Sequence, residues 1–165
     1  MESIPGSLNE GEAQFVGDVR EYLHMRKSEF EDKEVFLLRN LTRGKGIGFF
    51  EAGGGEAFYP DFILWLIQDK QQSIAFIDPH GLRYAQGGFN DPKIQLYKDL
   101  KALESALQPS CHEWHVSLTS FVVCTSEIDQ ATKWFGDTID EFEKNHVLFR
   151  DDAGYVEKLL KSITT

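Results

Sequence analysis

The sequence predicts an α/β domain in which a mixed central β-sheet is flanked by helices. Two dense apolar runs, residues 61–67 and 73–78, are separated only by a short polar segment. Runs that are apolar on both faces are typical of central strands, and the short connection makes them an antiparallel hairpin. Around them the order is helix, four strands, helix, strand and further helices, which indicates a covered mixed sheet. The 165 residues suit one domain, with a core at 9–125 and a helical C-terminal extension at 126–165.

The N-terminal elements follow from capping and periodicity. Asn9 has the position of an N-cap and Glu12 lies at the third helical position, before apolar residues at helical spacing. This helix is expected to end near residues 26–28. The β-rich segment 34–41 predicts a strand, and a hairpin-like turn connects it to a second strand at 47–51. The three glycines at 53–55 predict a flexible loop.

The C-terminal elements begin with Pro92, which has the position of a first-turn proline. The helix that follows it is expected to end at Pro109. A strand is predicted at 115–125, and the remaining segments predict helices at 128–135, 139–144 and 156–163 and a short edge strand at 147–149.

Charge and composition narrow the classes of function. The formal charge is −10, whereas a bare nucleic-acid-binding domain is usually basic. Residues 35–50 nevertheless contain no acid but do contain Arg39, Arg43 and Lys45, and Arg83 is the only charged residue in 79–90 when His80 is counted as neutral. Arg39, Arg43 and Lys45 are either part of a solvated hairpin or contacts for phosphates, and the sequence leaves both open.

No apolar run is long enough to cross a bilayer, and two cysteines are too few for a disulfide framework, so a cytoplasmic protein is expected.

Two acids lie at the ends of the central hairpin strands. With the turn centred between residues 70 and 71, Asp61 falls opposite His80 and Ile63 opposite Asp78. Side chains alternate along a strand, so Asp61, Asp78 and His80 share one face at one end of the sheet. Two carboxylates this close require a cation or a shared proton, and a hard divalent ion suits such oxygen ligands. Taken singly, either acid is also explained as a turn residue beside a proline.

The residues that flank Asp61 and Asp78 resemble a known family signature. Tyr59-Pro60-Asp61-Phe62, followed by Ile77-Asp78-Pro79-His80-Gly81, resembles the PD-(D/E)XK signature of restriction-endonuclease-like nucleases. The longer phrases LLRNLTRGKGIGFFEAGGG, FYPDFILWL and FIDPHGL are similar to nuclease domains fused to restriction-type DEAD/DEAH helicases. The resemblance implies a restriction-endonuclease-like core over residues 9–125, built from a helix, three strands, a helix and a further strand.

The resemblance also implies roles for individual residues. Asp61 and Asp78 would ligate Mg²⁺ or Mn²⁺ with the Pro79 carbonyl, and a glutamate on the first helix often joins them. Glu12 is the best candidate for that glutamate, although a capping box explains it equally well. His80 stands where the family has a catalytic lysine. A migrated lysine, Lys93 or Lys98, could replace it, although both also suit a solvated helix face.

The function implied is a metal-dependent DNA endonuclease that works with a helicase or within a restriction or defence assembly. Arg39, Arg43, Lys45 and Arg83 would contact the DNA backbone. The alternative is a nuclease-fold module without activity that serves DNA binding or protein docking.

Overall fold

The computed structural model describes residues 6–42, 45–50, 57–85 and 87–164. Its centre is a mixed sheet of five strands in the order β1-β2-β3-β4-β5. The first three strands are antiparallel neighbours, and β3, β4 and β5 are parallel to one another. The prediction of an α/β domain with a mixed sheet flanked by helices is therefore confirmed. The strands are β1 Glu34–Arg39, β2 Phe62–Gln68, β3 Gln71–His80, β4 His115–Cys124 and β5 Val147–Phe149.

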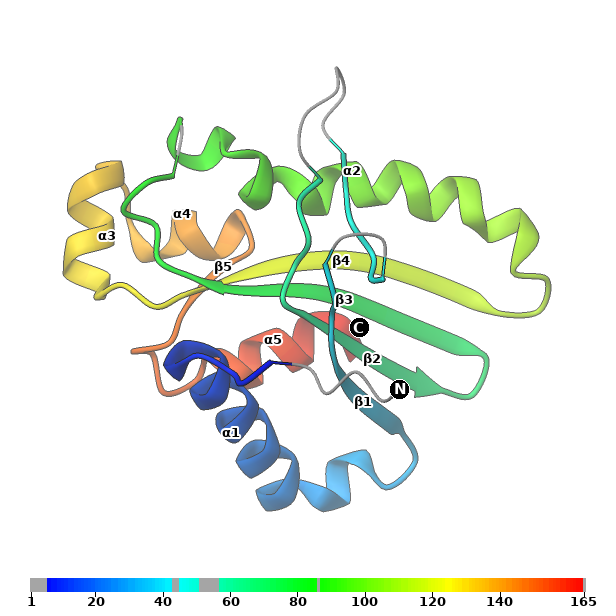
Figure 1. Ribbon diagram of the computed structural model, residues 1–165. Helices are drawn as coiled ribbons and strands as arrows, with labels where there is room; N and C mark the ends of the chain where they lie inside the picture. The colour runs from blue at the N-terminus through cyan, green and yellow to red at the C-terminus, as the bar shows by residue number, and fades with distance from the viewer. Residues whose placement is uncertain (1–5, 43–44, 51–56, 86, 165) are drawn as a thin grey trace.

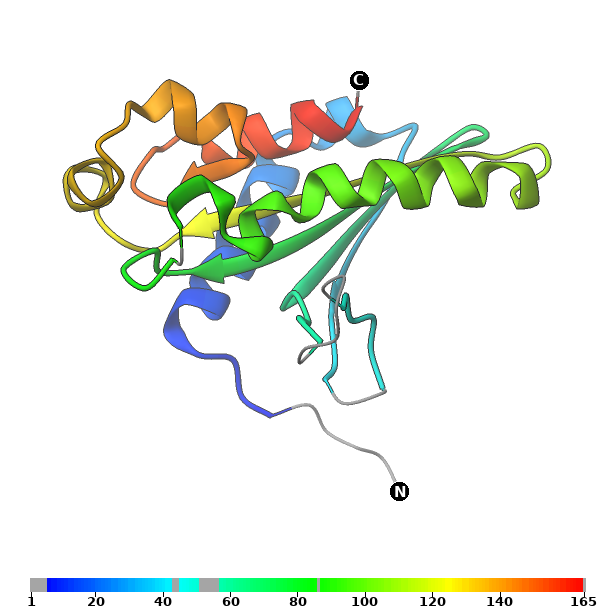
Figure 2. The same cartoon turned by 90° about the horizontal axis from the view of Figure 1, so that it is seen from above.

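Helices cover both faces of this sheet (Figure 1). Helices α1 (Glu10–Met25) and α5 (Tyr155–Thr164) pack on one face, where Phe15, Leu64 and Leu159 are completely buried. Helix α2 (Pro92–Leu107) runs along β4 on the other face (Figure 2). The smaller elements are η1 Lys27–Phe30, η2 Gly88–Asn90, η3 Gln108–Ser110, α3 Ile128–Phe135 and α4 Ile139–Lys144. Among the described residues, no helix is both long and apolar enough to span a membrane.

The segment between β1 and β2 differs from the predicted hairpin. β1 pairs directly with β2, and residues 45–50 form no strand beyond a single bridge between Phe49 and Phe58. The prediction of a strand at 47–51 is therefore wrong for its described part. The ring of Tyr59 lies 2.5 Å from where a Cβ of Gly48 would stand, so this ring packs directly on the backbone of Gly48. The predicted glycine loop at 53–55 lies outside the described residues.

The central hairpin has a turn one residue earlier than predicted. Gln68 pairs with Gln71, so the turn is Asp69-Lys70, and Asp69 adopts a positive φ of 51°. Aspartate tolerates this left-handed conformation better than most residues. The pairing is therefore shifted by two positions, and the residue opposite Asp61 is Asp78 rather than His80. A shift of two preserves the alternation of faces, so the shared face of these acids survives.

The C-terminal segment is integral to the same core. β5 extends the sheet beside β4, and Leu159, Leu160 and Ile163 of α5 are buried against Phe15 of α1. The Tyr155 hydroxyl donates a hydrogen bond of 2.7 Å to Asp18 of α1. Residues 126–165 thus add a strand as well as helices to the core predicted for 9–125.

Candidate functional site

Two carboxyl groups face each other where β2 begins and β3 ends. The β2–β3 register, continued by one residue, sets Asp61 opposite Asp78, and both lie on the sheet face that α2 covers because Ile63 and Phe76 pack there. Asp78 is only 7% exposed. With both acids ionised, Oδ2 of Asp78 has no hydrogen-bond donor among the described residues. A buried, unsatisfied carboxylate oxygen is rare and indicates a missing cation or proton.

The two acids cannot both ionise freely. Burial, and then the charge of Asp78, raise the pKa of Asp61 to about 7. Burial also raises the pKa of Asp78, while the Lys93 ammonium and hydrogen bonds from Asp61 oppose that rise. We therefore place one shared proton on Asp61 near neutral pH, with the negative charge on Asp78. A divalent cation at this point would displace that proton.

Lys93 supplies the positive charge of the site. Its Nζ lies 3.8 Å from Oδ2 of Asp78 and 4.9 Å from the centre of the Phe58 ring. The first turn of α2 positions this lysine: Asp91 is the N-cap and accepts a hydrogen bond from the Lys93 N–H (2.9 Å), and Pro92 occupies the first turn. Of the two lysines left open by the sequence, Lys93 is the one that reaches the carboxylates. Lys98 is exposed, and its ammonium lies 5.5 Å from the centre of the Tyr97 ring.

His80 lies on the same strand face as Asp78, at the end of β3. Its side chain remains accessible to solvent. Partial burial, and then the charge of Lys93, lower the pKa of its imidazole, and Asp91 and Asp61 oppose this effect. The neutral ring is therefore the dominant form at pH 7, so His80 does not replace a lysine as a fixed cation.

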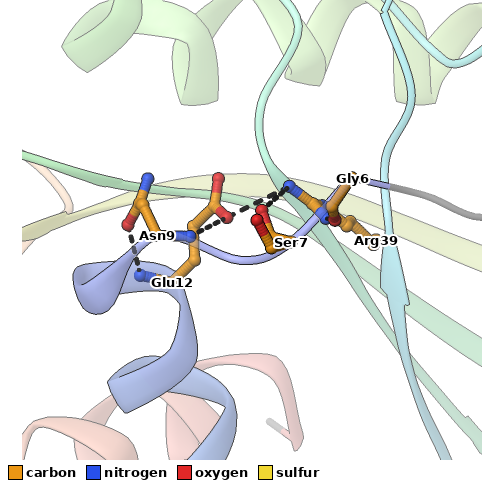
Figure 3. A network of polar contacts seen from close by, with 5 residues as sticks. All are labelled: Gly6, Ser7, Asn9, Glu12 and Arg39. Atoms are coloured by element: carbon orange, nitrogen blue, oxygen red, sulfur yellow. Dashed lines mark hydrogen bonds and ion pairs between the residues drawn. The ribbon is translucent and has the colours of Figure 1, made fainter.

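Glu12 belongs to a separate, satisfied network at the start of α1 (Figure 3). Its Oε2 accepts hydrogen bonds from the Asn9 N–H (3.0 Å) and from Arg39 (3.1 Å), and Asn9 caps Glu12 in return. Arg39 also donates to the carbonyls of Gly6 and Ser7. The capping box is thus confirmed. Glu12 is still near enough to the acid pair for its charge to raise the pKa of Asp61.

The Pro79 carbonyl lies between the two strands. The His80 carbonyl accepts from the Thr125 N–H on the β4 side, and carbonyls alternate along a strand, so that of Pro79 points toward β2. The register places Pro60 opposite it, and proline has no N–H to donate. The sheet therefore leaves this carbonyl available beside Asp61, as the sequence interpretation requires.

The cations expected to contact DNA differ in their surroundings. Arg39 is held by Glu12, Gly6 and Ser7. Lys45 and Arg83 are exposed, and the Arg83 guanidinium lies 5.5 Å from the centre of the Tyr84 ring. Arg43 lies outside the described residues.

The donor set suits a divalent ion only in part. Asp61, Asp78 and the Pro79 carbonyl are oxygen donors of the kind that Mg²⁺ binds together with several waters, and the orphaned Oδ2 of Asp78 fits such a ligand. In the part of the chain that the structure describes, however, no group of three or more His, Cys, Asp or Glu side chains is arranged around one ion.

A cleft of about 630 Å³ adjoins this site, and it was not predicted from the sequence. Lys93 and His80 form one wall, and Phe50, Phe58, Tyr59 and Tyr84 form much of the rest. These aromatic residues lie on segments without regular structure, where hydrophobic periodicity carries no signal. Comparison with protein-family models, with curated proteins and with solved structures gives no match.

Proposed function

We propose that this domain is a metal-dependent nuclease with a restriction-endonuclease-like core that hydrolyses phosphodiester bonds in DNA. The observation that carries the proposal is the buried Asp61–Asp78 pair with Lys93 beside it. The order α1, three strands, α2 and β4 around the pair is the arrangement that the sequence resemblance implies. An acid pair of this kind costs stability unless it binds something, so a structural role explains it poorly.

In this proposal each residue has a distinct task. Asp61, Asp78 and the Pro79 carbonyl would hold Mg²⁺ or Mn²⁺, which lowers the pKa of a bound water and polarises the phosphate. Lys93 donates hydrogen bonds to the oxygens on which negative charge develops. The neutral His80 can accept a proton from the attacking water or orient it.

The test is a Mn²⁺-dependent cleavage assay on single- and double-stranded DNA. We expect Asp61→Ala to abolish cleavage without unfolding the protein, and Lys93→Ala to reduce cleavage far more than His80→Ala. Lys98→Ala is the matched control, because it removes a cation from the same helix but away from the acids. Cleavage that persists in purified Asp61→Ala would contradict the assigned role.

The isolated domain should bind duplex DNA weakly and lose that binding steeply as salt rises. The formal charge of −10 repels phosphates, and the attraction between phosphates and cations weakens as salt rises. We propose that a helicase chain or domain supplies the missing affinity within a larger assembly. Tight duplex binding by this chain alone at physiological salt would argue against such a partner.

One observation favours the alternative of an inactive module. Glu12, the candidate third ligand, is already engaged by Asn9 and Arg39, and a histidine stands in the usual lysine position. Under this alternative neither Mn²⁺ nor Mg²⁺ binds through Asp61 and Asp78. If catalysis was lost at position 80 alone, His80→Lys should restore cleavage to a protein that still binds Mn²⁺.

A further inference from the structure

The cleft beside the acid pair is unusually aromatic at its mouth. Phe50 is 73% exposed and Tyr84 is 79% exposed, and both line the cleft together with Phe58 and Tyr59. Large aromatic side chains left in water at a concave site are typical of a binding surface rather than of a packed core. The Arg83 guanidinium lies 5.5 Å from the centre of the Tyr84 ring.

The charges of the cleft disfavour a row of phosphates. Among the described residues that line it, Lys93 is the only lysine or arginine, and Asp91 and Asp99 are also present. Duplex DNA is held mainly by cations along its backbone, and this cleft offers too few. Single-stranded nucleic acid is held differently, because its unstacked bases stack on aromatic side chains and need fewer ion pairs.

Lys93 connects the cleft to the acid pair. Its ammonium is 4.9 Å from the centre of the Phe58 ring within the cleft and 3.8 Å from Oδ2 of Asp78 outside it. Lys93 therefore belongs both to the lining of the cleft and to the acid site.

We propose that this cleft binds unstacked bases of single-stranded DNA, with Tyr84 and Phe50 as stacking platforms. The choice of DNA, and of the phosphate at Asp61 and Asp78 as the one cut, rests on the proposed function. The stacking itself rests on the cleft alone. The domain then acts on single strands or on single-stranded segments next to a duplex.

The experiment measures binding by fluorescence anisotropy on the full chain in EDTA, so that cleavage plays no part. The probe is a labelled oligodeoxythymidine of about 16 nucleotides, compared with the same strand paired to oligodeoxyadenosine. We expect the single strand to bind at least ~10-fold more tightly than the duplex. Tyr84→Ala and Phe50→Ala should each weaken single-strand binding by roughly 5- to 100-fold, as loss of one stacked base predicts.

Controls separate stacking from folding and from general hydrophobicity. Tyr84→Phe keeps the ring and should stay within about twofold of the wild type. Trp114→Ala removes another exposed aromatic residue, which directly precedes β4 at the end of the sheet opposite the acids, and it should change nothing. Because Tyr84 and Phe50 are largely exposed, their alanine variants should unfold at the wild-type temperature.

The outcomes are distinguishable. Equal binding of single strand and duplex, or wild-type binding by both alanine variants, overturns the inference. So does a cleft that takes apolar peptides but no oligonucleotide. If the binding pattern holds while no variant cleaves DNA with Mn²⁺, the inference stands and the proposed nuclease activity fails.

Discussion

Glu12 and Asp78 are equally buried, each with 7% of its surface exposed, yet their surroundings are opposite. Glu12 accepts hydrogen bonds from the Asn9 N–H and from Arg39, and it completes the start of α1. Asp78 has an oxygen without a donor, an acid opposite it and a lysine at ion-pair rather than hydrogen-bond distance.

The difference separates an acid whose hydrogen-bond partners are in place from an acid whose partners are missing. Burial of a charged group is tolerated when its partners are already in place, as around Glu12. Where partners are missing, the folded state retains an unfavourable charge that only a ligand or a proton can relieve. Degree of burial alone would have assigned both acids to the same class.

The largest predicted effect is the difference between Asp78 and Glu12 in Mn²⁺-dependent cleavage. We expect Asp78→Asn to lower Mn²⁺-dependent cleavage by roughly 1000-fold or more, because it removes a ligand charge that no neighbour replaces. Glu12→Gln should lower it less than about 10-fold, since the amide oxygen can still accept from Asn9 and Arg39. Initial rates at saturating Mn²⁺ provide the measurement. Equal losses in both variants would make Glu12 a ligand as well.

In the absence of metal, the order of the two acids should reverse: loss of Glu12 should destabilise the fold more than loss of Asp78. Glu12→Ala should lower the free energy of unfolding by about 2 kcal/mol, because it breaks the capping box and removes the ion-pair partner of Arg39. Asp78→Asn should be neutral or stabilise by about 1 kcal/mol, because it relieves the repulsion with Asp61. Urea denaturation in EDTA measures both. Glu10→Ala is the control, since Glu10 is an exposed acid in the same helical turn. A strongly destabilised Asp78→Asn would show that this acid is structural after all.

The pH dependence of stability should sharpen the contrast further. The pKa of Asp61 is raised to about 7 in the folded protein, so its contribution is favourable below the ordinary value near 4 and is lost as pH rises through about 7. Relative to Asp61→Asn, the wild type should therefore lose on the order of 2 kcal/mol over this range, after allowing for partial exposure. His80 and His146 have lowered pKa values and change stability in the opposite sense. His146 is common to both proteins, and the variant removes only the weakest of the charges that act on His80. Parallel curves would exclude a raised pKa at Asp61.

The smallest predicted effect is the number of protons released when Mn²⁺ binds. Binding of Mn²⁺ should release about half a proton at about pH 7 and close to one at about pH 6, because the ion displaces a proton whose pKa is about 7. Calorimetry in buffers of different ionisation enthalpy measures the number released. Release that does not change with pH would mean that the metal binds elsewhere.

Much of the fold was predictable because hydrophobic patterning and helix caps are local signals. Asn9, Pro92 and the apolar run of β2 mark their elements directly in the sequence. The described residues 47–50 do not form the expected strand, and local periodicity could not reveal that β1 pairs with β2 instead. A strand partner is a tertiary choice that short-range periodicity does not encode.

The acid pair was predictable for a related reason. The two-position error in register left the parity of Asp61 and Asp78 intact, so their shared face could be inferred without the correct turn. The choice between Lys93 and Lys98 could not be made, because it depends on how α2 lies over the sheet. Five residues apart, the two lysines differ by about 140° around the helix and about 7.5 Å along it.

β1 is an edge strand of the sheet, and this position affects how the protein behaves in solution. Among the described residues no strand pairs with its outer side, and Phe36 and Leu38 are each 43% exposed on it. An exposed edge strand can pair with a strand of another chain. The charge of −10 keeps molecules apart at neutral pH, but that repulsion vanishes near the isoelectric point of about 4.9. Self-association should therefore peak in mildly acidic buffer, where the folded monomer is otherwise sound.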